Sequence, residues 1–280
     1  MKALFDQVSN NCSKLVTKKY STSFSLAVKM LSPKIRTAIY NIYGFVRFAD
    51  EIVDSFHSYD KEKLMNKFES DYYAALEDGI SLNPILNAFQ KTVFQYQIPD
   101  DLVQSFLKSM KADLYKTEYN TKEEYDSYIY GSADVVGLMC LKVFVNGDSE
   151  KYDELKYAAM RLGSAFQKVN FLRDLKDDIE VLDRSYFPNV DLRALDYDSK
   201  NLIIQEIEED FEVAFKDGIL KLPIEAKFGV YVAFRYYKRL LKKLKNTPSS
   251  EIMETRIRIS NPMKINLLAR SFVKYKLNLI

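Results

Sequence analysis

The sequence predicts an all-α fold, and three observations support this prediction. Apolar residues recur at three- and four-residue steps, the spacing that places them on one face of a helix. Gly and Pro are scarce, with 8 and 7 among 280 residues, and most stand where helices would begin or end. No alternating apolar and polar run demands a strand. The length suits one domain over residues 1–280, with roughly eight to ten helices.

The first half of the chain contains clear signals for the start of helices. Ser32-Pro33 and Asn83-Pro84 each pair an N-cap residue with Pro at the first helical position. Pro99-Asp100 marks a further break between helices. Three sets of apolar residues in this half have helical spacing: Ile35, Ala38, Ile39, Ile42, Val46, Ala49 and Val53; Leu64, Phe68, Tyr72, Ala75 and Leu76; and Leu102, Val103, Phe106, Leu107 and Met110.

The second half is helical as well, with one exception. Thr121-Lys-Glu-Glu124 has the pattern of a capping box at the start of a helix. A helix through Ile203 to Leu220 should end before Pro223. Residues 183–200 lack a clear period, so we expect a long loop there. Helix ends are expected at three glycines, Gly79, Gly147 and Gly218.

The composition excludes several classes of function. With 41 basic and 39 acidic residues, the net charge of +2 argues against a nucleic-acid-binding protein. Cys12 and Cys140 form neither a disulfide framework nor a zinc motif, which indicates reduced thiols in the cytoplasm. The single histidine, His57, argues against His-based metal sites. The most apolar run, Val135–Leu141, is interrupted by Lys142, so we expect a soluble or peripheral protein without a membrane span.

The first of two acidic clusters lies in the segment Arg47-Phe48-Ala49-Asp50-Glu51-Ile52-Val53-Asp54. Asp50 and Asp54 are one helical turn apart and therefore share a face. Most acidic pairs of this kind are solvated, but this segment is apolar nearly all round, which is typical of a buried helix. Buried carboxylates are costly unless a metal ion or a basic group lies near them. The cluster therefore indicates a functional site.

The second acidic cluster follows a little over a hundred residues later. Gln167, Asn170, Asp174 and Asp178 step by three, four and four, so two amides and two carboxylates lie along one stripe of a helix. Asp177 falls off this stripe and is expected to be solvated. The alternative interpretation is a charged outer face shared with Lys168, Lys176 and Glu180. The apolar residues of the segment form no clean opposite face, which favours contacts with protein on several sides.

Together the two clusters suggest a metal-dependent enzyme. If the two helices face each other, four carboxylates point into one space and repel one another unless a cation joins them. Oxygen-rich sites with little histidine suit Mg²⁺, which binds one or two carboxylates together with substrate phosphates. Scattered arginines and lysines are usually surface residues, but near these clusters they can bind a diphosphate. The candidates are Arg47, Arg173, Arg184, Arg256, Arg258 and Lys264.

Two other segments can contribute to such a site. Ser21-Thr22-Ser23-Phe24 offers hydroxyls before a helix, where backbone N–H groups can bind an anion; an ordinary N-cap is the alternative. Tyr128 to Gly137 combines small residues with aromatics in a helical stretch, where glycine costs about 1 kcal/mol relative to alanine. A close helix crossing, or a bound chain that needs room, would explain these small residues. The sequence contains no Gly-x-Gly-x-x-Gly or P-loop pattern.

In order along the chain, these segments resemble those of the squalene/phytoene synthases, which are head-to-head prenyl synthases, and above all the bacterial phytoene synthase branch. The matching patterns are Ser21-x-Ser23-Phe24; Tyr43-x-x-x-Arg47-x-x-Asp50-Glu51-x-x-Asp54; Met110-Lys-Ala-Asp113-Leu; Tyr128 to Gly137; Gln167-x-x-Asn170-x-x-Arg173-Asp174-x-x-x-Asp178 with Arg184-x-Tyr186-x-Pro188; and Arg256-Ile-Arg258-Ile-Ser260 with Lys264. One such pattern alone is weak, whereas six in the same order are specific. Two positions depart from the family: Glu51 replaces an aspartate, and Asp134 stands near the expected prenyl channel where glycine is usual.

The resemblance implies an isoprenoid-synthase helical bundle around a central prenyl-diphosphate cavity. The catalytic residues it implies are Asp50, Asp54, Asp174, Asp178, Tyr43 and Arg47. The substrate-binding residues it implies are Ser21, Ser23, Phe24, Arg47, Tyr128, Ala133, Gln167, Asn170, Arg173, Arg184, Tyr186 and Arg258. The ligands it implies for Mg²⁺, or for Mn²⁺, are Asp50, Glu51, Asp54, Asn170, Asp174 and Asp178. No NADPH is expected.

The reaction that the resemblance implies is the Mg²⁺-dependent condensation of two geranylgeranyl diphosphates to phytoene, through a cyclopropylcarbinyl diphosphate, in carotenoid biosynthesis. The first alternative is a dehydrosqualene or squalene synthase that uses farnesyl diphosphate; squalene synthases resemble longer chains with a C-terminal anchor, which is not found in the last residues, 274–280. A class I terpene cyclase, a chain-elongating prenyl synthase and a non-catalytic helical scaffold protein are further alternatives. Because the substrates and product are greasy, a cytoplasmic protein with peripheral contact at the inner face of the membrane is consistent with this reaction.

Overall fold

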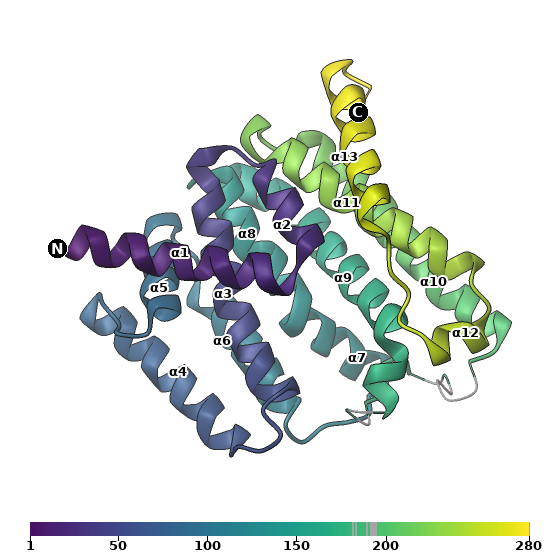
Figure 1. Ribbon diagram of the computed structural model, residues 1–280, viewed down its shortest axis with the longest axis horizontal. Coiled ribbons are helices and arrows are strands. Elements are labelled where there is room, and N and C mark those ends of the chain that lie inside the picture. The colour runs from purple at the N-terminus through teal and green to yellow at the C-terminus, as the bar shows by residue number, and fades with distance from the viewer. Residues whose placement is uncertain (181, 183, 189, 191–194, 280) are drawn as a thin grey trace.

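Helices make up nearly all of the chain, which confirms the all-α prediction. The computed structural model describes every residue except 181, 183, 189, 191–194 and 280. The described residues form no strand, and a single parallel bridge joins Glu118 to Ser185. The α-helices are α1 (Lys2–Tyr20), α2 (Thr22–Lys29), α3 (Pro33–Asp54), α4 (Lys61–Asp78), α5 (Pro84–Tyr96), α6 (Asp100–Ala112), α7 (Lys122–Ile129), α8 (Val135–Val145), α9 (Ser149–Glu180), α10 (Tyr197–Val213), α11 (Ile224–Asn246), α12 (Ser249–Glu254) and α13 (Asn261–Lys276) (Figure 1).

The predicted start signals begin helices because their side chains satisfy free backbone N–H groups. The Ser32 hydroxyl accepts from the backbone N–H of Lys34 at the start of α3. The Asn83 side-chain oxygen accepts from the backbone of Ile85 at the start of α5. Thr121 caps α7 in the same way, as the capping-box pattern predicts. At the end of α4, Gly79 has a φ of 66°, the left-handed conformation that favours glycine.

Other boundaries differ from the prediction. Gly218 does not end a helix in the left-handed conformation; it closes a π-helical segment, η3 (Ala214–Gly218), and a methyl group there would lie 2.8 Å from Cβ of Ala158. Helix α10 already begins at Tyr197, so the loop predicted over residues 183–200 is shorter, and it lies partly outside the described residues. Helices α1 to α13 also exceed the predicted eight to ten. One of the additional helices is α1, whose fully buried residues, Ser9, Ser13 and Thr17, are polar.

The stretch from Tyr128 to Gly137 is a site of close helix crossing. It includes a second π-helical segment, η1 (Tyr130–Asp134), between α7 and α8. A methyl group on Gly131 would overlap Ser109 of α6, and one on Gly137 would lie 2.9 Å from the carbonyl oxygen of Ala159 on α9. The small residues therefore allow close helix contacts, which is one of the two explanations that the sequence left open.

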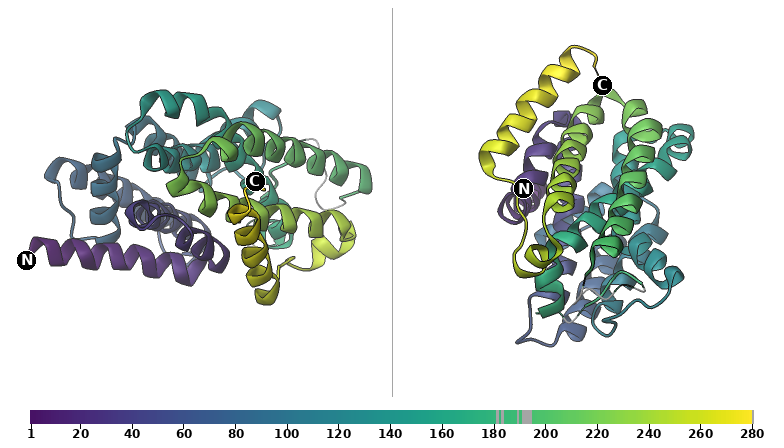
Figure 2. Two further views of the ribbon diagram at one scale, coloured as in Figure 1. Left: turned by 90° about the horizontal axis from the view of Figure 1, so that it is seen from above. Right: turned by 90° about the vertical axis from the view of Figure 1, so that its right-hand side faces the viewer.

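The continuous run Lys122–Val145, formed by α7, η1 and α8, is long and apolar enough by composition to cross a membrane. In the fold, 56% of its apolar 18-residue stretch is buried. Helix α8 packs against α3, α6 and α9 (Figures 1 and 2). The run therefore has the contacts of a core helix, and it holds α3 and α9 on two sides of the same region.

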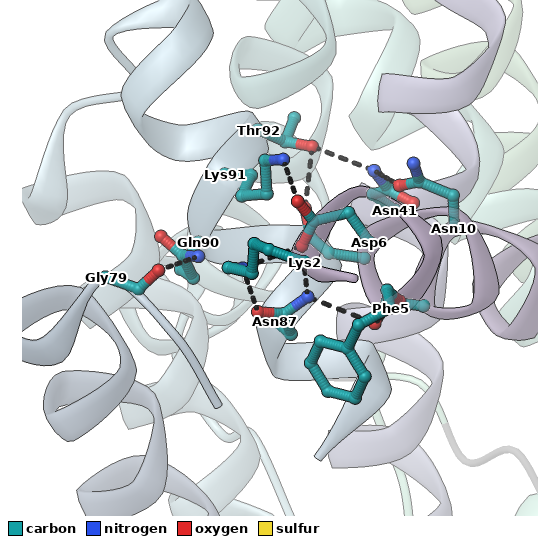
Figure 3. A network of polar contacts seen from close by, with 12 residues as sticks. Lys2, Phe5, Asp6, Asn10, Asn41, Gly79, Asn87, Gln90, Lys91 and Thr92 are labelled. Carbon is teal, nitrogen blue, oxygen red and sulfur yellow. Dashed lines mark hydrogen bonds and ion pairs between the residues drawn. The ribbon is translucent and has the colours of Figure 1, made fainter. Parts of the chain in front are cut away.

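A polar network fixes α1 against α5 (Figure 3). The Asp6 carboxylate accepts from Lys2 at 2.7 Å and from Lys91 at 2.6 Å. It also accepts from the side-chain amide of the buried Asn87 at 3.1 Å. Hydrogen bonds from Lys2, then Lys91 and Asn87, lower the pKa of Asp6 below its ordinary value. The ionised carboxylate thus stabilises the folded state.

We expect Asp6→Asn to lower the free energy of unfolding by about 1 kcal/mol at neutral pH, because charged partners lose their acceptor. The pKa of Asp6 is lower in the folded state than its ordinary value of 3.8. The stability that Asp6 contributes is therefore fully present above pH 3.8 and is lost progressively as the pH falls from there toward the folded-state pKa. Urea unfolding at neutral pH and at about pH 3 measures both effects. The control is Asp71→Asn, whose pair with Lys67 is exposed. Equal destabilisation by both substitutions would contradict the prediction.

Candidate functional site

A cavity of about 450 Å³ lies among α2, α3, α8, α9 and α11, a size typical of small-molecule sites. Its lining changes from apolar to polar along two of these helices. On α3 the lining residues run from Ile39 to Arg47, and on α9 they run from Leu155 through Asn170 to Arg173. Both helices therefore pass from an apolar part of the cavity to a polar part as they approach their C-terminal ends.

The first acidic cluster occupies the last two turns of α3, beyond the polar lining. Arg47 pairs with Asp50, at 2.5 Å, and with Glu51. Asp54 pairs with Arg184, whose Nη1 lies 2.7 Å from Oδ1. All three acidic side chains thus contact an arginine.

The second acidic cluster occupies the last two turns of α9. Arg173 donates to the Asp174 carboxylate through Nε at 2.8 Å. Arg256, which is 82 residues further along the chain, approaches the same carboxylate through Nε at 2.7 Å. Asp177 is exposed, as its position off the stripe predicts. The sequence alone does not reveal the contact between Arg256 and Asp174.

The carboxylates raise one another's pKa. Burial and then the charge of Asp174 raise the pKa of Asp178 to about 8. Burial and then the charge of Asp54 raise the pKa of Asp50. Both clusters also stand at helix C-termini, where the helix dipole is negative, and neither α3 nor α9 has a basic residue in its last turn. This end of the cavity therefore favours a bound cation.

The donor set suits Mg²⁺, because both clusters offer carboxylate oxygens and the charges of neighbouring carboxylates raise the pKa of Asp50 and of Asp178. Among the described residues, no three Asp, Glu, His or Cys side chains form a ready-made metal site. Instead, the carboxylates pair with arginines: Arg47 with Asp50, Arg184 with Asp54, and Arg256 with Asp174. A metal would have to replace or join these contacts.

Nine of the residues predicted for the site line the cavity: Ser21, Phe24, Tyr43, Arg47, Ala133, Gln167, Asn170, Arg173 and Arg256. Phe24 and Tyr43 stack with their ring centroids 4.9 Å apart, which gives the cavity an aromatic surface. Burial raises the pKa of Tyr43 to about 12, so its hydroxyl is protonated at neutral pH. The helical spacing of the two motifs thus predicts much of the polar lining.

The other predicted substrate-binding residues are not among those that line the described cavity: Ser23, Tyr128, Arg184, Tyr186 and Arg258. Ser23 is half-buried on α2, and Arg258 is exposed. The backbone carbonyl of Arg258 accepts a hydrogen bond from the side chain of Lys243, and this bond joins the segment to α11. Contact with substrate remains a prediction for all five residues.

Three of these residues form a buried cluster behind Asp54. The rings of Tyr128 and Tyr186 stack with centroids 5.4 Å apart. The Tyr128 hydroxyl donates to Oδ2 of Asp113 at 3.0 Å. Arg184 donates through Nη2 to the carbonyl oxygen of Asp113 at 3.0 Å while its Nη1 pairs with Asp54. The cluster fixes the carboxylate at the end of α3 relative to the end of α6.

The structure adds aromatic residues that the motifs do not include. The Tyr20 hydroxyl donates to Glu51 at 3.0 Å, and the guanidinium of Arg47 lies 4.5 Å from the centroid of the Tyr20 ring. The Tyr237 hydroxyl donates to the side-chain oxygen of Asn170 at 3.3 Å. Both tyrosines line the cavity. The chain has 20 tyrosines, and no local pattern distinguishes these two.

Asp134, which departs from the family pattern, is buried and is not among the cavity-lining residues. It accepts a hydrogen bond from the hydroxyl of Ser164 at 2.7 Å. Its neighbours Ala133 and Gly163 line the cavity instead. Asp134 therefore belongs to the packing of η1 on α9.

Comparisons with known proteins identify the family of this chain. The family model for squalene/phytoene synthase matches residues 17–262. The chain is 26% identical to phytoene synthase 2, chloroplastic, of Solanum lycopersicum, over 93% of this chain and 90% of that protein. It is 27% identical to the 15-cis-phytoene synthase of Synechocystis, over 92% and 83% of the two chains. It is also 26% identical to the phytoene synthase of Pseudescherichia vulneris, over 80% and 79%.

Solved structures share the fold. A dehydrosqualene synthase in complex with a ligand aligns with a TM-score of 0.81 and 19% identity, over 97% of this chain and 98% of that one. A squalene synthase of Alicyclobacillus acidocaldarius aligns with a TM-score of 0.73 and 19% identity, over 90% and 97%. The helical bundle around a central cavity is thus confirmed. Because the family model covers both acidic clusters and most of the chain, the protein belongs to the squalene/phytoene synthase family of prenyl-transferring enzymes.

Proposed function

We propose that the protein is a phytoene synthase, which joins two geranylgeranyl diphosphates head to head through a cyclopropylcarbinyl diphosphate. The observation that carries this proposal is an apolar cavity with both acidic clusters at its polar end. Such a cavity accommodates a hydrocarbon chain and presents its diphosphate to charged groups. The relatives named phytoene synthase support this choice of product.

The arginines at the polar end are suited to bind the diphosphate. Arg47, Arg173 and Arg256 line the cavity and at present hold carboxylates. A diphosphate would become their new partner, since guanidinium groups bind phosphate oxygens in the same bidentate manner. Their charge would also stabilise the negative charge that grows on the departing diphosphate.

We propose Mg²⁺, or Mn²⁺, as the cofactor; when bound, it would neutralise the diphosphate and assist its departure. The residues that would hold the ion are Asp50, Glu51, Asp54, Asn170, Asp174 and Asp178. The chain orients two of these side chains through tyrosines: Tyr20 donates to Glu51, and Tyr237 donates to Asn170. Such contacts restrict the positions of the oxygen donors.

The cavity wall would protect the allylic cation that remains after the diphosphate leaves. The aromatic surface of Phe24 and Tyr43 can stabilise positive charge through cation–π contacts. The apolar lining on α3, α8 and α9 would exclude water, which would otherwise capture the cation. The double bond of the second substrate would then attack the cation, and loss of a proton would close the cyclopropane ring of the cyclopropylcarbinyl diphosphate. Departure of its diphosphate, rearrangement of the carbon skeleton and loss of a second proton would give phytoene without NADPH. We also propose a cytoplasmic location with peripheral contact at the inner face of the membrane, because the hydrocarbon chains partition into lipid.

Asp50→Asn and Asp174→Asn should each lower kcat at least about a hundredfold, because each removes a carboxylate charge from the diphosphate end of the cavity. Asp177→Asn is the matched control, since Asp177 lies on the same helix as Asp174 but is exposed. Its kcat should stay close to that of the wild type. Circular dichroism verifies that each variant is folded. If folded Asp50→Asn and Asp174→Asn both turned over substrate at the wild-type rate, these carboxylates would not belong to the active site.

Arg256→Gln should lower kcat/KM by about ten- to a hundredfold, the range expected for a lost hydrogen bond to a charged group. Arg256 contacts Asp174 and lines the cavity, whereas Arg258 is not among the lining residues. Arg258→Gln should therefore have little effect on steady-state kinetics. A larger loss in Arg258→Gln would favour the role that the family resemblance implies for Arg258.

The product identifies the substrate. Purified protein with Mg²⁺ and geranylgeranyl diphosphate, without NADPH, should yield a forty-carbon hydrocarbon with a central conjugated triene in the hexane extract, detected by chromatography. A parallel reaction contains farnesyl diphosphate, and a third contains a chelator, which should abolish turnover. A thirty-carbon product from farnesyl diphosphate alone would indicate a dehydrosqualene synthase instead. Folded protein that forms no hydrocarbon from either substrate would contradict the proposal.

A further inference from the structure

A second groove, with a volume of about 310 Å³, lies between α11 and α13. Five cationic side chains line it: Arg235, Lys238, Arg239, Lys242 and Arg270. The four from α11 occupy the face opposite to Val230, Ala233 and Tyr237, which line the cavity. The groove is therefore separated from the candidate active site by the whole width of α11.

The positive charge of this region is much greater than the net charge of +2 suggests. Helices α11 and α13 together carry eleven Lys and Arg residues but a single acidic residue, Glu225, at the start of α11. The remainder of the chain is consequently net negative. Among the described residues, no ion pair joins the five groove cations to an acidic side chain. The groove thus presents uncompensated positive charge to an anionic partner.

Apolar side chains accompany this charge on α13. Arg270, Val273, Lys274 and Leu277 follow the i, i+3, i+4, i+7 spacing and share a face. Val273 is 54% exposed and Leu277 is 62% exposed. The other side of α13 packs against α11 through Tyr275. Figures 1 and 2 show α13 at the outer edge of the molecule.

We propose that the groove between α11 and α13 binds the phosphate groups of anionic phospholipids and seats the protein on a membrane surface. Lys and Arg near an anionic leaflet each contribute about 1 kcal/mol to binding. The exposed Val273 and Leu277 would add apolar contact with the lipid. A nucleic acid or a free phosphate would use the charge but not these apolar side chains. This inference extends the peripheral contact proposed above and rests on the groove, not on the reaction.

Vesicle co-sedimentation tests the proposal. The wild-type protein should bind vesicles of phosphatidylcholine mixed equally with phosphatidylglycerol, should bind phosphatidylcholine vesicles weakly, and should dissociate as salt is raised. Replacing the exposed Lys238, Arg239, Lys242 and Arg270 with Gln should lower the partition coefficient about a hundredfold or more. The double substitution Val273→Ser and Leu277→Ser should lower it severalfold while leaving all charges in place.

The matched control removes four positive charges from other surfaces. Lys63, Lys67, Lys108 and Lys156 are exposed on α4, α6 and α9, and their replacement with Gln should preserve vesicle binding. Equal loss in both quadruple variants would overturn the proposal, because net charge alone would then explain it. Tight binding of inorganic diphosphate or of a duplex oligonucleotide, with no binding to anionic vesicles, would also overturn it. Turnover of the groove variant in detergent, expected at the wild-type rate, separates this test from that of the proposed reaction.

Discussion

The repulsion among carboxylates at the C-terminal ends of α3 and α9 is the constraint on which the rest of the site depends. The helix dipoles add negative character at the same end of the cavity. Arg47, Arg173, Arg184 and Arg256 offset this charge in the described structure. In the proposed reaction, the carboxylates would hold the metal ion and the guanidinium groups would bind the phosphates.

The cavity lies between α3 and α9, so these two helices must stay apart along its length. Helix α8 packs against both of them, and close crossings at Gly131 and Gly137 allow η1 and α8 to approach α6 and α9. Two π-helical segments, η1 and η3, contribute lining residues to the cavity. Because π-helical turns often occur at functional sites, their position agrees with a cavity shaped for binding.

Helix α11 separates two regions of different character. One face contributes Val230, Ala233 and Tyr237 to the cavity, and the opposite face contributes four cations to the groove with α13. The near balance of charge over the whole chain conceals this separation, since the acidic residues lie mainly elsewhere. A net charge of +2 still argues against a general nucleic-acid binder, but it does not exclude a local surface for anions.

The sequence by itself determines the features that depend on neighbours within one or two helical turns. These include the caps at Ser32, Asn83 and Thr121 and the placement of Gln167 and Asn170 on one face of α9. The all-α class also follows from the periodicity. Helix α1, whose fully buried residues are polar, and the early start of α10, where the Asp196 side chain caps the backbone N–H of Ser199, were not predicted from apolar spacing.

Only the tertiary structure decides which distant residues meet. It brings Arg256 to Asp174 and to the cavity wall but not Arg258, although both arginines belong to the same short basic segment. It places Arg184 behind Asp54, 130 residues away in the chain. It also selects Tyr237 from many tyrosines to orient Asn170. Local spacing fixes a side chain's direction on its own helix, whereas these contacts depend on how whole helices pack against one another.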